Sequence, residues 1–307
     1  MRSFIAFGLM AVLALPAAAA SKKITWAGCG ISKNAFMSEM AAAYKKKTGV
    51  EIDFKGGGAT KGIRDVAARS VDIGGTCRHV IEDPKTNLTV AEERRVQLMP
   101  VAWDALVVIV HKDNPVDSVT LDQIRAIYTG KVTNWRELGG RDAPLELYVR
   151  KGKISGVGRT LRELVFIDYD QEFVAKHVVE ESATLERDMV TNPNGIGITG
   201  ISSARKLKDI AKVLKLDGKD PSYENIKAGN YLLYRPIYMV THLQNGDPEV
   251  RRFINFVMGP EGKTVMRNVG TVPYEDAIHL WLKYLEQQNK ALARAIEQSS
   301  AKGRKPL

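Results

Sequence analysis

Short apolar runs alternate with amphipathic stretches through the first part of the chain. Residues 24–27 and 50–54 have the length and pattern of strands, and residues 71–73 form a third short apolar run. Between them, residues 34–47 and 61–70 place apolar side chains at helical spacing. This β-α-β-α-β order predicts an α/β protein with a mainly parallel sheet flanked by helices.

The same alternation continues almost to the end of the chain. Thr120 is a candidate helix N-cap, and Gly130 can end the helix that follows it. Residues 192–195, Asn-Pro-Asn-Gly, are a strong turn signal before another strand. The further predicted elements are strands at 106–111, 145–149, 196–198 and 238–240, and helices at 120–129, 159–166, 249–258 and 262–269.

The alternation pauses at two places, near 100–104 and near 234–238. We interpret these pauses as crossovers between two lobes, with the second lobe inserted in the first. The predicted organisation is a signal peptide at 1–20, lobe 1 at 21–103 and 236–283, lobe 2 at 104–235, and a C-terminal helix with a basic tail at 284–307.

The N-terminus has the pattern of a cleaved signal peptide. Arg2 gives a positive start, residues 4–15 are almost wholly apolar, and residues 17–20 are four alanines. The apolar run is shorter than the roughly 20 residues that a spanning helix needs. We therefore expect cleavage near Ala20 and a soluble mature protein in the periplasm; a buried N-terminal helix is the alternative interpretation.

The net charge of the chain excludes few classes of function. The 307 residues include 45 Lys and Arg against 35 Asp and Glu, a formal net charge of +10. This excess suits an anionic ligand, although an ordinary basic surface has the same composition. Zinc-ligand spacing, nucleic-acid-binding signatures and heptad arrays are absent from the sequence. We expect no metal, no cofactor and no nucleic-acid partner.

Glycine-rich loops follow three of the predicted strands, at 28–32, 56–60 and 75–78. A basic stretch, 150–160, follows another strand and opens a helix. Ligands of open α/β sheets collect at the carboxyl ends of strands, where free helix N–H groups attract anions. The loops lack P-loop spacing, and each by itself is compatible with a plain turn. Together they predict an anion site.

Longer motifs carry a resemblance to a known family. They are IRDVAARSVDIGGT, PVAWDALVVIVHKDNPV, VTLDQIRAIYTGKVTNWRELGG, LDGKDPSYENIKAGNYLLYRPIYMVT and FINFVMGPEGKTVMRNVGTVPY. With them the chain resembles the periplasmic phosphate-binding proteins of ABC transporters. The resemblance implies a two-lobed type II periplasmic-binding fold, in which each lobe is a mainly parallel sheet flanked by helices. It also implies a cleft between the lobes that closes over a tetrahedral oxyanion, with phosphate as the first choice.

Carried over by position, the resemblance implies a set of ligand-binding residues. Backbone N–H groups come from the first loop, a hydroxyl comes from the third, and the positive charge comes from Arg150 or, as the alternative, Arg159. The full predicted set is Cys29, Gly30, Ile31, Gly58, Ala59, Thr76, Cys77, Arg78, Arg150, Ser155, Gly156 and Arg159.

The chain departs from the family pattern at its two cysteines. Cys77 and Arg78 stand where the family carries an aspartate, and Cys29 replaces a serine or threonine of the first loop. Both cysteines map to adjacent pocket loops of one lobe. They are expected to be a disulfide, two small buried residues, or a retuned site for a sulfate-like anion, arsenic(III) or a soft metal.

Two function classes remain open from the sequence. The first is a monomeric solute-binding protein that delivers an oxyanion to an inner-membrane ABC permease. The second is a periplasmic adaptor that reports ligand occupancy to a membrane signalling partner. We do not expect an enzyme, because Cys77 and His79 have no identifiable third group that would orient them as nucleophile and base.

Overall fold

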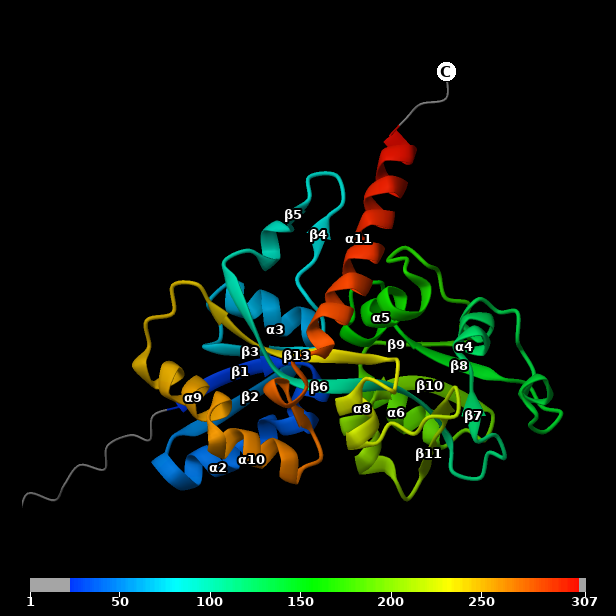
Figure 1. Cartoon of the computed structure of the whole chain (residues 1–307), viewed down its shortest axis with the longest axis horizontal. Coiled ribbons are helices and arrows are strands. Elements are labelled where there is room, and N and C mark those ends of the chain that lie inside the picture. Colours follow the sequence, from blue (N-terminus) through cyan, green and yellow to red (C-terminus); the bar gives the residue numbers. More distant parts are fainter. Residues whose placement is uncertain (1–22, 304–307) are drawn as a thin grey trace, which may run out of the picture.

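The computed structural model describes residues 23–303 (Figure 1). The predicted signal peptide lies outside these residues. Within them, a ten-stranded sheet runs through the whole molecule. Its main strands, in sheet order, are β2 (Glu51–Gly57), β1 (Lys23–Gly28), β3 (Ile73–Thr76), β13 (Tyr234–His242), β6 (Val96–His111), β10 (Gly195–Gly200), β8 (Glu146–Arg150) and β9 (His177–Val179).

The two ends of this sheet define two lobes. Lobe 1 is built on β1, β2 and β3, and lobe 2 on β8, β9 and β10. Strands pair in parallel within each end, whereas β13 and β6 run antiparallel to their neighbours in the middle. The shorter strands are β11 (Ala211–Val213) and β14 (Val272–Pro273) against β6, the hairpin of β4 (Glu82–Asp83) with β5 (Leu88–Thr89), and the pair of β7 (Ser118–Val119) with β12 (Lys215–Leu216).

Strand β6 belongs to both lobes. Its residues up to Ala105 pair with β13, and its residues from Leu106 pair with β10. The sequence predicted only 106–111 as a strand. The prediction missed the first ten residues because residues 96–100 are half-exposed and carry no continuous apolar signal; pairing with β13 makes them a strand.

Helices cover both faces of the sheet (Figure 1). In lobe 1 they are α1 (Gly30–Ser32), α2 (Ser38–Thr48), α3 (Gly58–Ala67), α9 (Pro248–Met258) and α10 (Pro260–Asn268). In lobe 2 they are α4 (Leu121–Tyr128), α5 (Gly156–Leu161), α6 (Ser182–Val190), α7 (Ile201–Ala204) and α8 (Tyr223–Ala228). A π-helical turn, Lys33–Met37, joins α1 to α2, so the chain is helical without a break from Gly30 to Thr48. A second such turn, Arg162–Phe166, extends α5.

Local signals explain several helix ends. Thr120 caps α4 as the sequence predicted, because its side chain accepts a hydrogen bond from the Gln123 N–H at 3.1 Å. Asp247 caps α9 by accepting from the Glu249 N–H at 2.7 Å, and Pro248 occupies the first helical position. These caps fix where α4 and α9 begin.

The last helix, α11 (Leu280–Gly303), extends away from the body beside α5 (Figure 1). Its buried residues Tyr284 and Ala291 pack inward. Further along, the Arg294 side chain lies 3.2 Å from Asp168 of lobe 2. The helix therefore follows the return to lobe 1 but contacts lobe 2.

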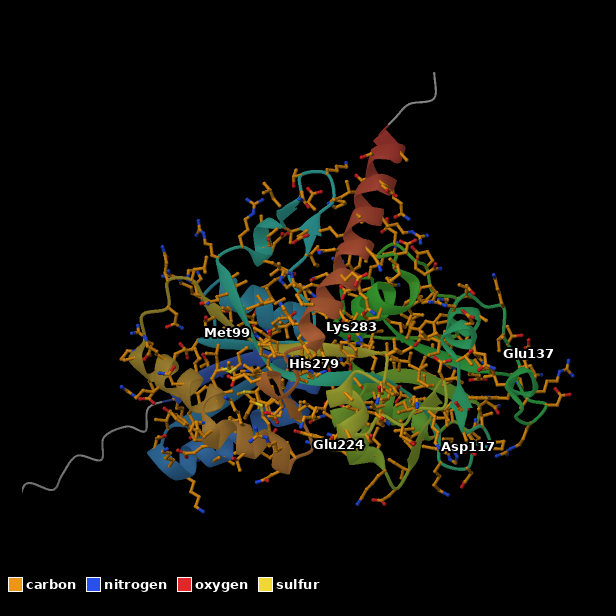
Figure 2. All side chains as sticks on the ribbon, viewed as in Figure 1. Met99, Asp117, Glu137, Glu224, His279 and Lys283 are labelled. Carbon is orange, nitrogen blue, oxygen red and sulfur yellow. The ribbon has the colours of Figure 1, made fainter. Side chains whose placement is uncertain are left out.

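One large apolar cluster extends through both lobes, with Trp26, Phe36 and Trp103 almost fully buried. Charged side chains such as Asp117, Glu137 and Glu224 lie at the exposed periphery of lobe 2 (Figure 2). In the described part of the chain, every helix is too short or too polar to cross a membrane.

Candidate oxyanion site

A cavity of about 360 Å³ lies where the two lobes meet. Lobe 1 contributes the ends of β1 and β2 and the helix starts that follow them. Lobe 2 contributes the end of β8 and the start of α6. The residues that line it are Trp26, Gly28, Cys29, Gly30, Lys33 and Gly56–Gly58 from lobe 1, and Arg150, Glu180, Glu181, Ser182 and Ala183 from lobe 2.

The first wall of the cavity is the start of the helical run that begins at Gly30. Cys29 is its N-cap: the backbone there is extended, and Sγ accepts a hydrogen bond from the Ser32 N–H at 3.3 Å. A Cβ atom on Gly30 would meet nothing within 4 Å, so the backbone is open on that side. A long helix concentrates partial positive charge at this end, which favours an anion.

The second wall is the turn from β2 into α3. Gly56, Gly57 and Gly58 have φ values of +66°, +105° and +87°. Only glycine adopts this conformation without strain, which explains why three glycines stand in a row. Gly58 opens α3, and a Cβ there would also meet nothing within 4 Å. The turn thus brings a second helix start to the cavity with its backbone uncovered.

Arg150 brings positive charge from lobe 2. It ends β8, and its Nη1 donates to Ser182 Oγ at 2.7 Å while Nη2 donates to the Glu180 carbonyl. Its Nε is buried and has no hydrogen-bond partner among the described residues. A guanidinium has five N–H donors, so the side chain keeps donors for a ligand. Burial lowers the pKa of Arg150, although an arginine stays charged.

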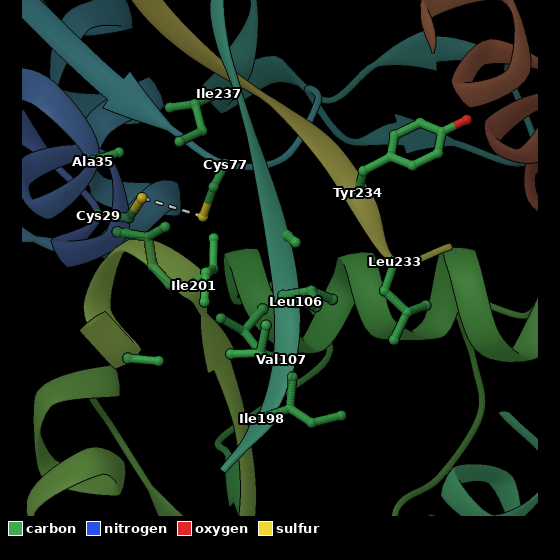
Figure 3. Close-up of a cluster of buried hydrophobic side chains, with 14 of the residues drawn as sticks. Cys29, Ala35, Cys77, Leu106, Val107, Ile198, Ile201, Leu233, Tyr234 and Ile237 are labelled. Atoms are coloured by element: carbon green, nitrogen blue, oxygen red, sulfur yellow. Dashed lines mark hydrogen bonds between the residues drawn. The ribbon is translucent and has the colours of Figure 1, made fainter. Parts of the chain in front are cut away.

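Cys29 and Cys77 lie together at the back of the first wall. Both are buried thiols, and their Sγ atoms are 3.1 Å apart (Figure 3). Burial raises the pKa of Cys29, but hydrogen bonds from Cys77 and Ser32 outweigh it and lower that pKa below the ordinary thiol value. The hydrogen bond to Cys29 is the larger cause, and burial the smaller, that raises the pKa of Cys77 well above the ordinary thiol value. The pair therefore titrates as a unit that holds its first negative charge on Cys29.

Arg235 lies behind the pair and is fully buried. Its Nη1 donates to the carbonyls of Cys77 at 3.3 Å and Gly156 at 3.1 Å, and its Nη2 lies 3.4 Å from Asp104 Oδ2. Since Cys77 belongs to lobe 1 and Gly156 to lobe 2, this guanidinium joins the lobes. Sequence reasoning missed Arg235, although a charged residue inside an apolar strand was a usable signal.

Several predicted residues form the contact between the lobes and do not line the cavity. A Cβ atom on Gly156 would lie 2.4 Å from Cys77 Sγ and 3.0 Å from the Ala59 side chain. Ser155 is buried as the N-cap of α5 and accepts from the Gly158 N–H at 3.2 Å. Ile31 is 1% exposed. The start of α5 is thus packed directly against lobe 1.

Arg78 and Thr76 make other contacts. The five N–H donors of Arg78 go to the carbonyls of Ile154 and His79, to Thr60 Oγ1 and to both carboxylate oxygens of Glu93. Thr76 Oγ1 donates to the Arg78 carbonyl at 3.1 Å. In this arrangement Arg78 has no free donor for a ligand.

The structure divides the predicted set into two groups. Arg159, the alternative to Arg150, stacks its guanidinium 3.8 Å above the ring of Tyr169 and is outside the cavity lining. Lys33 and Ser182 line the cavity but were not predicted, since neither lies in a glycine loop. The predicted residues in the lining are Cys29, Gly30, Gly58 and Arg150. Those outside it are Ile31, Ala59, Thr76, Cys77, Arg78, Ser155, Gly156 and Arg159.

Two lobes that share strand β6 and line one cavity between them define a class of binding proteins, and comparison with known families agrees. The chain belongs to the PBP superfamily, because a family model described as PBP superfamily domain matches residues 16–261. This confirms the resemblance that the motifs predicted.

Curated relatives carry related names. The phosphate-binding protein PstS of Borreliella burgdorferi is 23% identical over 258 residues, covering 81% of this chain and 90% of the relative. PstS of Bacillus subtilis is 24% identical, with 84% and 82% covered. Protein SphX of Synechococcus elongatus is 29% identical, with 75% and 71% covered. The first two names describe binding proteins and not enzymes, in agreement with the prediction.

Solved structures confirm the fold. A substrate-binding protein of Clostridium perfringens, crystallised with bound phosphate, is 28% identical with a TM-score of 0.73, covering 82% of this chain and 99% of that one. An ABC-type phosphate transport receptor of Vibrio cholerae is 25% identical with a TM-score of 0.61, covering 82% and 100%. The predicted fold class is therefore correct.

Proposed function

We propose that this protein captures inorganic phosphate in the cavity between its lobes and delivers it to an ABC transporter. The observation that carries the proposal is the position of Arg150: a guanidinium whose Nε is unpaired among the described residues lines one cavity with two helix starts whose glycine backbones are open. A tetrahedral oxyanion can accept hydrogen bonds from all three. The names of the PstS relatives and the bound phosphate of the Clostridium perfringens protein support phosphate as the anion.

Binding would couple to closure of the lobes. Ile154 of lobe 2 accepts hydrogen bonds from Thr60 Oγ1 at 3.0 Å and Arg78 Nε at 2.9 Å, so its carbonyl is held by two residues of lobe 1. Opening the cavity would break these bonds, and an anion that contacts both lobes would offset that cost. The crossing strands β6 and β13 are the natural hinge, and we assign the lobe boundaries to the crossovers predicted from the sequence.

The proposal also covers the location of the protein, its oligomeric state and its transporter partner. We infer that a signal peptide at 1–20 directs a monomer to the periplasm, where the closed form docks on the inner-membrane permease. The family membership and the PstS relatives support this setting.

Isothermal titration of the purified mature protein against phosphate, arsenate, sulfate, molybdate and arsenite tests the proposal. We expect one phosphate site per chain, with arsenate as the nearest competitor because it has the same shape and charge. Saturable binding of sulfate without phosphate would reject phosphate as the ligand. An absence of binding to every anion would reject the capture function.

A further inference from the structure

The two cysteines occupy positions that a disulfide can join. Cys29 directly follows Gly28 of β1, and Cys77 directly follows β3, the adjacent parallel strand. Gly28 and Gly75 are partners in that pairing, and the Cys29 N–H donates to the Gly75 carbonyl at 3.1 Å. Neighbouring strands lie about 4.8 Å apart, within the Cα range of disulfides. With Sγ atoms 3.1 Å apart, a small side-chain shift is enough for a bond.

We propose that Cys29 and Cys77 form a reversible disulfide by exchange with a small disulfide, and that this modification tightens anion binding in the adjacent cavity. The second part rests on the proposed function, because it concerns the same anion site. The first part depends on the thiol pair alone.

The two sulfurs differ in access and in activation. Cys29 lines the cavity and is 5% exposed, whereas Cys77 is 1% exposed and lies outside the lining. Ser32 contacts Cys29 Sγ twice, through its N–H at 3.3 Å and through its hydroxyl at 3.0 Å. Hydrogen-bond donors at a helix start favour the thiolate, which is the attacking species. Cys29 is therefore the first residue to react, and Cys77 resolves the intermediate.

The exchange balances in two steps. The Cys29 thiolate attacks one sulfur of the small disulfide, forms a mixed disulfide and releases one small thiolate. Cys77 then loses its proton to solvent and attacks Cys29 Sγ, releasing the second small thiolate. The protein loses two electrons and the small disulfide gains them.

The link to the anion is electrostatic. In the reduced form with Cys29 deprotonated, the thiolate accepts hydrogen bonds at the helix start where the anion would bind, and it lies in the same cavity lining as Arg150. Thiolate and anion thus compete for one region of positive potential, and two negative charges at close range repel each other. A disulfide is neutral, so its formation removes the competitor.

The wild-type protein is sufficient for the test. One sample is equilibrated with excess oxidised glutathione and another with dithiothreitol. Part of each sample is denatured and alkylated, and its mass is measured by mass spectrometry to count the free thiols. The rest of each sample is titrated with phosphate at pH 8. We expect no alkylated cysteine in the oxidised sample and two in the reduced one. We expect the oxidised form to bind phosphate about tenfold more tightly, the order of effect that one nearby charge produces. Cys29→Ser should show no redox dependence, because it lacks the attacking thiolate. Cys77→Ser should stop at the mixed disulfide, seen as the added mass of one glutathione on Cys29.

Each of the other possible results would contradict one part of the proposal. Two alkylated cysteines after oxidation reject the disulfide. A disulfide with equal phosphate affinity in both forms rejects the effect on the anion. If neither form binds phosphate, the proposed function fails together with that effect, while the alkylation count still decides whether the disulfide forms.

Discussion

Arg78 and Glu93 form a two-bond ion pair in the interior of the protein. Nη1 of Arg78 lies 2.9 Å from Oε2 of Glu93 and Nη2 lies 2.6 Å from Oε1, and both side chains are at most 1% exposed. The carboxylate of Glu93 thus balances the positive charge of Arg78. Arg150 pairs with no carboxylate between residues 23 and 303 and is therefore the better-placed cation for an anion in the cavity.

Removing the carboxylate of this pair should destabilise the fold. Glu93→Gln leaves the buried Arg78 charge uncompensated, which costs about 3–5 kcal/mol of unfolding free energy. Burial raises the pKa of Glu93, but the hydrogen bonds and the charge of Arg78 lower it by more. The net pKa of Glu93 is therefore below its ordinary value of 4.5. The stabilisation is therefore complete above pH 4.5 and is lost as pH falls through the lowered pKa.

Denaturant unfolding at pH 7 and at lower pH measures this effect. Glu92→Gln is the matched control, since Glu92 is exposed on the same turn. Equal stability of the two variants at pH 7 would show that the buried pair contributes nothing specific.

Arg150 should carry a measurable share of phosphate affinity. Arg150→Ala removes the charge and the unpaired Nε donor, and we expect at least about tenfold weaker binding, since a charge-assisted hydrogen bond contributes roughly 1.5–3 kcal/mol. Arg159→Ala is the control, because Arg159 stacks on Tyr169 outside the cavity lining. A loss confined to Arg159→Ala would reverse the assignment of the two arginines.

Gly156→Ala should hinder closure of the lobes. The added methyl group would lie 2.4 Å from Cys77 Sγ, closer than any real contact. We expect a penalty of about 1–3 kcal/mol, the usual cost of overpacking, seen as weaker phosphate binding or lower stability. Adding Cys77→Ala should restore much of the loss, because Cys77 Cβ lies 4.0 Å from the new methyl position. If both binding and stability are unchanged in Gly156→Ala, the lobes do not need this contact.

The reduced protein should contain one unusually acidic thiol. We expect Cys29 to titrate with a pKa of about 6, followed as thiolate absorbance or as the pH dependence of alkylation. Cys77→Ser replaces the neighbouring sulfur and should shift this pKa, whereas Cys29→Ser should abolish the transition. A single titration near the ordinary value of 9.0 would contradict the arrangement of the pair.

The sequence by itself determined much of the local structure. Strand and helix periods predicted the alternating elements, and Thr120 predicted the start of α4, because these signals act within a few residues. The glycines at 56–58 predicted a turn that other residues could not form without strain, since all three have positive φ. The family resemblance placed Cys29 and Cys77 in adjacent pocket loops, which the local pattern could not do, and the structure brings their sulfurs to 3.1 Å.

Only the tertiary structure decided which charged groups remain free. Arg78, Arg150 and Arg159 look equivalent in the sequence, yet the first is paired with Glu93, the third lies over Tyr169, and only the second lines the cavity. Arg235 joins Asp104 across 131 positions of the chain, a pairing that no local pattern encodes. The physical reason is that a charged side chain can bind a ligand only when the folded protein leaves some of its hydrogen-bond donors without partners. Those partners come from residues that are distant in sequence and become neighbours only in the folded protein.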